Sequence, residues 1–203
     1  MKNVLLIVDP QNDFIKGTLA VEGAELAMSN LTQYIEEKGD KYDYIFITMD
    51  THPKNHSSFI ANGGQWPTHC IKDTAGWQIS EDLELSLRGR SGVGFFFKGT
   101  AFDKEEYSIF DNERDGAVLA YKLNKLVKAD SDTYVDVCGI AGDYCVLETL
   151  KGLVNIVDPK TITILEDFTA SIDGGEKLTQ FAAENNITFT KDAHLNLESY
   201  GNN

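Results

Sequence analysis

The fold class that this sequence predicts is a three-layer α/β/α architecture with a mostly parallel central sheet. Short apolar runs alternate along the chain with segments whose apolar residues recur at helical spacing. Strands separated by helices need crossover connections, which favour parallel pairing and place helices on both faces of the sheet. A hydrophobic share of 42% with 25% charged residues is ordinary for a globular protein and gives no sign of disorder.

The predicted elements follow one another in regular order. The first run, NVLLIV, is apolar throughout, as expected of a strand that is buried on both faces. Later runs are rich in β-branched and aromatic residues, and the segments between them have helical period. In chain order we expect a strand over 3–8, a helix over 23–38, strands over 44–49 and 94–98, a helix over 115–128, a strand over 133–140, a helix over 143–154, a strand over 161–166, a helix over 175–185 and a strand over 187–190.

One domain over residues 1–203 is expected, because single cores commonly serve chains of this length and no linker, repeat or low-complexity tract divides the sequence. The exception to the alternation is the segment 50–80, which has little periodicity. A loop of this length in a compact domain is usually functional or disordered. Its aromatic residues Phe59, Trp66 and Trp77 favour an ordered, functional loop.

The formal charge of -14 argues against nucleic acid or an anionic membrane as a partner, because either would need a clustered positive surface. There is no apolar run long enough to span a bilayer, and the first residues read as a strand and not as a signal peptide. The 3 cysteines have no disulfide-framework spacing. We therefore expect a cytoplasmic protein with free thiols that acts on small molecules.

Four chemically capable residues fall at the ends of predicted strands. Asp9 follows the first strand, Asp50 the second and Lys98 closes the third, while Cys145 lies shortly after the strand over 133–140. In open α/β sheets, ligands bind in the crevice outside the carboxyl ends of the strands. The sequence therefore predicts that these four side chains meet in one site.

Cys145 is the candidate nucleophile. The run GIAGDYC leads from a strand into a helical pattern, so that Asp143 is placed to cap the helix and Cys145 falls in its first turn. Free N–H groups and the helix dipole at that end would lower the pKa of the thiol. The alternative is a buried cysteine that acts as a small hydrophobic residue, which is how we interpret Cys138 and Cys70.

Asp9 and Lys98 are the candidate partners of the thiol. Partial burial at a strand end would raise the pKa of Asp9 to a value useful in proton transfer. Lys98 could keep Asp9 ionised and stabilise negative charge on a substrate. The alternatives are a turn residue at the strand end for Asp9 and a lysine whose stem lies along apolar surface for Lys98.

The histidines predict a metal site. Asp50, His52 and His69 supply one oxygen and two nitrogen ligands, a set that suits zinc, manganese or iron and leaves positions open. His56 could be a fourth ligand or hydrogen-bond to one of the others. His194, close to the C-terminus, is expected on the surface.

Five motifs, VDPQNDF, DTHPKNHSSF, WPTHC, FFFKGT and GIAGDYCV, together resemble the nicotinamidases of the isochorismatase-like cysteine hydrolase superfamily. The resemblance implies hydrolysis of nicotinamide, and possible action on pyrazinamide, in NAD salvage, with one divalent metal, zinc before manganese or iron, and a homo-oligomer. The resemblance also implies roles for individual residues. Asp9, Lys98 and Cys145 match the family's catalytic triad, and Asp50, His52 and His69 match its metal ligands. The N–H groups of Ala141 and Cys145 match its oxyanion hole, where the peptide before Ala141 is typically cis, and Phe14, Trp66 and Tyr107 match the aromatic residues around the pyridine ring.

The chain departs from the family at Gly142, where relatives commonly carry threonine or another residue with a side chain. Members of the superfamily that hydrolyse isochorismate lack the cysteine and the metal motif, and amidases of other small substrates keep the triad but generally lack the metal ligands. A hydrolase of another small amide and a catalytically silent ligand-binding relative are the alternatives. A thiol redox role is disfavoured because no C-x-x-C pair is present.

Overall fold

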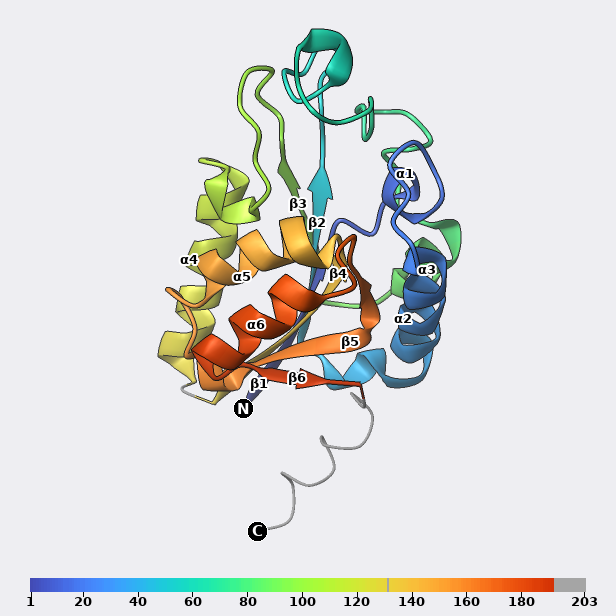
Figure 1. Ribbon diagram of the computed structural model, residues 1–203. Coiled ribbons are helices and arrows are strands. Elements are labelled where there is room, and N and C mark those ends of the chain that lie inside the picture. Colours follow the sequence, from blue (N-terminus) through green and yellow to red (C-terminus); the bar gives the residue numbers. More distant parts are fainter. Residues whose placement is uncertain (131, 192–203) are drawn as a thin grey trace.

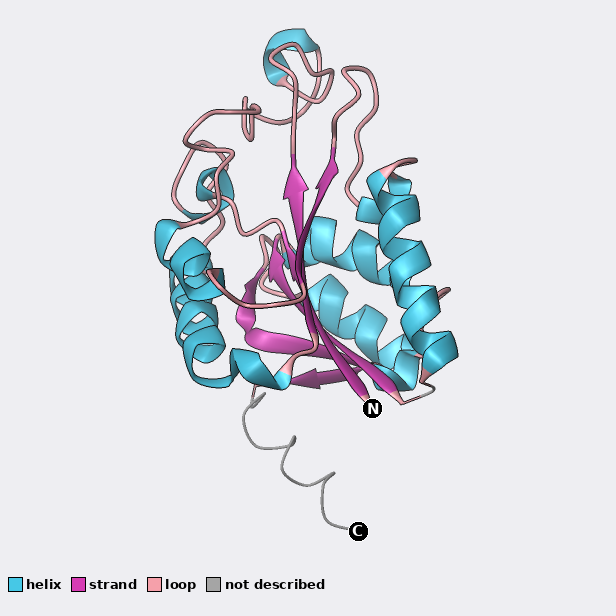
Figure 2. Cartoon of the chain, turned by 180° about the vertical axis from the view of Figure 1, so that it is seen from behind, coloured by secondary structure: helices cyan, strands magenta, loops and turns pink. Residues whose placement is uncertain are grey.

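The computed structural model describes residues 1–130 and 132–191, and it contains a parallel sheet between two layers of helices (Figures 1 and 2). This confirms the predicted fold class. The described strands form one sheet in the order β3-β2-β1-β4-β5-β6, and every pairing in it is parallel. The strands are β1 (Lys2–Val8), β2 (Tyr44–Asp50), β3 (Val93–Lys98), β4 (Thr133–Ile140), β5 (Ile162–Ala170) and β6 (Thr188–Thr190).

Helices cover both faces of the sheet because each presents an apolar side to it. On one face lie α1 (Asn12–Ile15), α2 (Ala24–Lys38) and α3 (Glu81–Leu87). On the other face lie α4 (Asp115–Ala129), α5 (Leu147–Leu153) and α6 (Glu176–Asn185), and Figure 1 shows them grouped there. The central strand β1 contributes alternate residues to the two cores, which explains why its sequence is apolar throughout.

Most boundaries agree with the sequence to within one or two residues, and the differences have local causes. The short helix α3 was not expected, because seven residues give too little periodicity to identify it. β5 continues to Ala170 past an irregularity in its pairing with β4. The helix expected over 143–154 begins with a wide turn over Gly142–Val146 and continues as α5.

Asp143 does not cap this helix, so that prediction was wrong. Its Oδ1 instead accepts a hydrogen bond of 2.8 Å from the backbone N–H of Ile172, which ties the turn to the segment after β5. His194 lies outside the described residues. No helix in the described part of the chain is long and apolar enough to cross a membrane.

The strand order positions the functional site. The chain runs outward from β1 through β2 to β3 on one side, and from β4 through β5 to β6 on the other. Connections therefore leave β1 and β4 in opposite directions, which opens a crevice at their carboxyl ends. Asp9 follows β1 and Cys145 lies in the turn after β4, so these two residues flank the switch point.

Candidate active site

Asp9, Lys98 and Cys145 meet in one buried cluster. The Nζ atom of Lys98 lies 2.9 Å from Oδ2 of Asp9 and 3.6 Å from Sγ of Cys145. Lys98 and Asp9 are fully buried, and Cys145 is 6% exposed. Thr48 in β2 fixes the acid, because its hydroxyl donates a 2.7 Å hydrogen bond to Oδ1 of Asp9. The three residues therefore have the proximity that an acid, a cation and a nucleophile need to act together.

Burial and charge set the protonation of this cluster. Burial raises the pKa of Asp9, against the opposing effect of Lys98. Burial also opposes a charge on Lys98, but the Asp50 and Asp9 carboxylates outweigh it and hold the pKa of the lysine well above its usual range. The cation is therefore permanent, and Asp9 is a carboxylate with increased affinity for a proton, as the sequence predicted.

The expected lowering of the Cys145 pKa is wrong. Burial raises the pKa of the thiol well above its usual range, and the Asp9 and Asp50 carboxylates add to this effect, which outweighs Lys98. The sequence argument considered the helix end but not the two buried carboxylates beside it. The resting residue is a neutral thiol, so an attack by its sulfur requires proton transfer to a nearby base.

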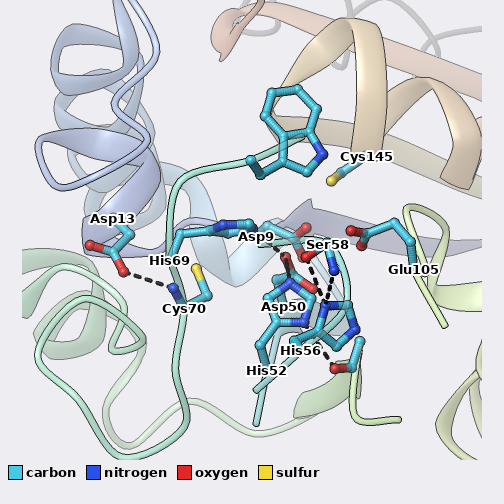
Figure 3. A network of polar contacts seen from close by, with 12 residues as sticks. Asp9, Asp13, Asp50, His52, His56, Ser58, His69, Cys70, Glu105 and Cys145 are labelled. Atoms are coloured by element: carbon cyan, nitrogen blue, oxygen red, sulfur yellow. Dashed lines mark hydrogen bonds and ion pairs between the residues drawn. The ribbon is translucent and has the colours of Figure 1, made fainter. Parts of the chain in front are cut away.

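The second cluster joins Asp50, the last residue of β2, to two histidines of the following loop (Figure 3). Oδ2 of Asp50 lies 2.9 Å from Nε2 of His52 and 3.4 Å from Nε2 of His69. All three side chains are buried. Burial opposes ionisation of Asp50, but Lys98 and His52 outweigh it and hold the pKa of this carboxyl well below its usual range.

The hydrogen bonds of the two histidines fix which nitrogen carries the proton. Nδ1 of His52 lies 3.0 Å from the Gly99 carbonyl, and Nδ1 of His69 lies 2.7 Å from the Pro67 carbonyl. A carbonyl only accepts, so Nδ1 is the donor in both rings. Their Nε2 lone pairs then face the Asp50 carboxylate, and Nε2 of His52 is buried without a hydrogen-bond partner among the described residues.

This arrangement is suited to a divalent metal ion. Three electron-pair donors that converge without a proton between them repel one another, and a cation removes that repulsion. The Nδ1–H contacts to carbonyl oxygens are those that commonly orient metal-binding imidazoles. Asp50, His52 and His69 therefore fit the metal that the sequence predicted.

His56 is placed differently. Its ring lies against that of His52, with centroids 3.9 Å apart, but both of its nitrogens are engaged. Nδ1 accepts a 3.2 Å hydrogen bond from the Ser58 backbone N–H and lies 2.7 Å from the Ser58 hydroxyl, while Nε2 lies 3.1 Å from the Lys104 carbonyl. No lone pair of His56 is left for a metal, so its contacts favour the hydrogen-bonding alternative.

Two residues that the sequence analysis did not single out hold the backbone of the metal-binding cluster in place. Gln11 is fully buried, and its side chain accepts a 2.7 Å hydrogen bond from the Asp50 N–H and donates a 2.8 Å bond to the Asp50 carbonyl. Asp13 accepts a 2.7 Å hydrogen bond from the backbone N–H of Cys70, the residue after His69. Both lie within the motif VDPQNDF, but only the position of the loop shows which backbone groups they bind.

One pocket brings the two clusters together. It is open to solvent on one side and has an apolar lining with a few polar groups, as small-molecule sites commonly have. The residues that line it are Phe14, Leu19, Val21, Asp50, Trp66, His69, Glu105, Tyr107, Ala141, Tyr144, Cys145 and Ile172. The structure thus brings the predicted residues Phe14, Trp66, Tyr107 and Ala141 to the same space as Cys145. The sequence did not indicate Leu19, Val21, Glu105, Tyr144 or Ile172.

The aromatic wall is held by its own contacts. The indole N–H of Trp66 donates a 3.0 Å hydrogen bond to the Tyr107 hydroxyl, and the Trp66 ring meets the Tyr144 ring edge to face at 5.1 Å. The Phe14 ring, which also lines the pocket, lies 5.5 Å from the His69 ring. The wall therefore offers flat apolar surfaces to a ring-shaped ligand.

The backbone before Cys145 has the conformation that the resemblance implied. The Ile140–Ala141 peptide bond is cis, and the Ala141 carbonyl accepts hydrogen bonds of 3.1 Å from the N–H groups of Tyr144 and Val146. Gly142 has a structural reason: a Cβ at this position would lie 2.0 Å from Oγ of Ser171. Ser171, which directly follows β5, therefore occupies the space that a side chain at position 142 would need.

The fold and the site together define a hydrolase with a three-layer α/β/α fold, in which a buried acid and lysine contact a cysteine beside a cluster suited to a metal ion. Comparison with known proteins leads to the same class. The chain belongs to the isochorismatase family, since the model of the isochorismatase domain matches residues 3–186.

Similar proteins are nicotinamidases and pyrazinamidases. The nicotinamidase/pyrazinamidase of Mycobacterium tuberculosis is 34% identical over 173 residues, which cover 83% of this chain and 86% of that protein. The pyrazinamidase of Pyrococcus horikoshii, solved in complex with zinc, has a TM-score of 0.75 at 29% identity and covers 94% of this chain and 99% of its own. PnC1 from L. infantum, solved in complex with nicotinate, has a TM-score of 0.79 at 29% identity over 95% of this chain and 93% of that one.

Proposed function

We propose that this chain hydrolyses nicotinamide to nicotinate and ammonia, with Cys145 as the nucleophile. The observation that carries the proposal is the contact of the buried Asp9 and Lys98 side chains with each other and with Cys145, which lines a pocket together with Asp50 and His69 of the metal-binding cluster. The relatives named above support the amide as substrate. The chain is thus a hydrolase of carbon–nitrogen bonds that acts on a small molecule.

The first half of the reaction forms a thioester. Asp9 accepts the proton of the Cys145 thiol, and the sulfur attacks the carboxamide carbon. The carbonyl oxygen becomes an oxyanion, which the N–H groups of Ala141 and Cys145 stabilise. Asp9 returns the proton to the nitrogen, the carbon–nitrogen bond breaks, and ammonia leaves. Lys98 balances the negative charge that passes between Asp9 and the sulfur.

The second half regenerates the thiol. Asp9, again a carboxylate, accepts a proton from water as the water oxygen attacks the thioester carbon. The carbon–sulfur bond then breaks, the proton on Asp9 passes to the sulfur, and the product acid loses its remaining proton to solvent and leaves as nicotinate. The raised pKa of Asp9 suits a group that must accept and return a proton in each half.

Asp50, His52 and His69 would hold the metal ion, which we propose is zinc before manganese or iron. When bound, the metal supplies a Lewis-acid contact for the pyridine nitrogen or for a water beside it, and so orients the ring. The zinc complex of the Pyrococcus horikoshii relative supports this choice. Phe14, Trp66 and Tyr107 would flank the ring, and pyrazinamide, which has a ring of the same size, is the second substrate to test.

The test compares two cysteine variants. Cys145→Ala should abolish ammonia release from nicotinamide while folding and metal content stay unchanged. Cys138→Ala is the matched control, because Cys138 is also buried but lies within β4 and packs in the core, and it does not line the pocket. An active Cys145→Ala variant would sink the nucleophile assignment, and mass spectrometry of a quenched turnover should detect the acyl group on the protein only when Cys145 is present.

The cellular setting and assembly are part of the proposal. The three cysteines Cys70, Cys138 and Cys145 are free thiols, which supports a reducing, cytoplasmic location. We expect a homo-oligomer, which light scattering on the purified protein would measure. Neither feature enters the chemistry described above.

A further inference from the structure

Glu105 lines the pocket but has no role in the reaction described above. It lies in the loop between β3 and α4 and lines the pocket with Asp50, His69 and Cys145. Its Oε1 accepts a 3.2 Å hydrogen bond from the N–H of Glu106, but Oε2 is buried and has no hydrogen-bond partner among the described residues. A buried carboxylate oxygen without a donor is costly, so its position calls for a ligand.

The residues on either side of Glu105 are fixed by hydrogen bonds. The Lys104 carbonyl accepts a 3.1 Å bond from Nε2 of His56. The Glu106 carboxylate accepts a 2.8 Å bond from the Gly99 N–H and a 2.9 Å bond from Nδ2 of Asn112. The backbone is thus held both before and after Glu105, so the loop directs this side chain into the pocket, and the bond from the Glu106 N–H leaves Oε2 free.

The carboxylate of Glu105 lies on the side of the pocket that contains the proposed metal ligands. A carboxylate oxygen of Glu105 and ring nitrogens of His52 and His56 all lie within 4.8 Å of one another. His56 already uses both nitrogens, so His52, whose Nε2 has no hydrogen-bond partner, is the neighbour with a lone pair to offer. Figure 3 shows the Glu105 carboxylate turned toward these residues from the side opposite His69.

We propose that Glu105 is a second carboxylate for the bound cation, which it reaches by accepting a hydrogen bond from a water on that ion. This inference rests on the proposed metal site of Asp50, His52 and His69. Two neutral imidazoles and one carboxylate leave one positive charge on a divalent ion, and Glu105 balances it. The water supplies the donor that Oε2 lacks, and the cation removes the repulsion between the Glu105 and Asp50 carboxylates.

The test is metal affinity, measured with Zn²⁺ and Mn²⁺ by competition against a chromophoric chelator. Glu105→Gln should weaken the affinity about 10- to 100-fold, the range for loss of a partner that hydrogen-bonds to a metal's ligands. Asp103→Asn is the matched control, because it removes the same charge from an exposed position in the same loop and should leave the affinity within about twofold. Metal-free Glu105→Gln should melt at or above the temperature of the metal-free parent, since an unsatisfied buried charge is removed.

Three outcomes would overturn the inference. These are an unchanged affinity in Glu105→Gln, an equal loss in Asp103→Asn, and a clear fall in the melting temperature of metal-free Glu105→Gln, which would indicate a structural role. His69→Ala separates the inference from the proposal on which it rests. If His69→Ala also binds metal as the parent does, the metal site itself is misassigned, whereas loss in His69→Ala with no change in Glu105→Gln contradicts the role of Glu105 alone.

Discussion

Gly99→Ala should damage the metal-binding cluster without removing any ligand. Gly99 follows Lys98 with φ of +66°, and a Cβ there would lie 2.5 Å from Oδ1 of Asp50 and 2.6 Å from Cε1 of His52. The positive φ costs about 1 kcal/mol for a residue with a side chain. Both contacts are far below van der Waals distance, so Asp50 or His52 must move, and overpacking of a buried site costs about 1–3 kcal/mol more. We therefore expect the free energy of unfolding to fall by about 2–4 kcal/mol.

The displaced ligands should also lower metal affinity by at least about tenfold, which corresponds to about 1.4 kcal/mol of binding energy. Gly89→Ala is the control, because Gly89 has φ of +76° but a Cβ there would have no atom within 4 Å. It should lose only the backbone cost of about 1 kcal/mol and bind metal normally. Urea unfolding of the metal-free proteins and metal titration provide both numbers. Equal unfolding energies for the two variants, with unchanged affinity in Gly99→Ala, would refute the steric reasoning.

Three further predictions follow from single contacts. Gly142→Ala should lower the free energy of unfolding by about 1–3 kcal/mol, and Ser171→Ala should relieve much of that loss, so that a double-mutant cycle in urea shows coupling. Burial raises the pKa of Asp136 to about 6, so the folded protein binds this proton more tightly than the unfolded chain. The contribution of Asp136 to the free energy of unfolding should therefore fall as pH rises from about 4 to about 6, by at most about 3 kcal/mol, and Asp136→Asn should lack this contribution when it is compared with the parent in urea unfolding at several pH values. Gln11→Ala should cost about 2 kcal/mol or more in the same assay, because it leaves the N–H and carbonyl of Asp50 without partners.

The meeting of Asp9, Asp50 and Lys98 was predictable because a parallel sheet gathers the ends of its strands. Asp9, Asp50 and Lys98 are separated by many residues in the sequence, yet each stands at the carboxyl end of a strand. The pairing register places Asp50 directly beside Lys98 on the neighbouring strand. Strand patterns alone therefore bring these side chains together, and no knowledge of the loops is needed.

The rest of the site depends on loop paths, which have no periodic pattern to reveal them. Glu105 looks in the sequence like any of three neighbouring charged residues, and only the hydrogen bonds of Lys104 and Glu106 direct it into the pocket. The pKa of Cys145 was predicted in the wrong direction for a related reason. Its first turn of helix is a local feature, whereas the burial and the two carboxylates that raise its pKa come from distant strands.

Lys98 connects the two clusters, and this affects how the metal should be tested. Its Nζ lies 2.9 Å from Asp9 and 3.3 Å from Asp50, so it is an ion-pair partner of both carboxylates. Removing Asp50 would take away a metal ligand and would also leave Lys98 paired with Asp9 alone. A loss of activity in Asp50→Ala would therefore report both effects. Within the described part of the chain His69 makes no such contact with Lys98, and its Nε2 lies 3.4 Å from the Asp50 carboxylate. His69→Ala is therefore the variant whose loss of turnover can be assigned to the metal, provided that added Zn²⁺ or Mn²⁺ in excess restores part of it.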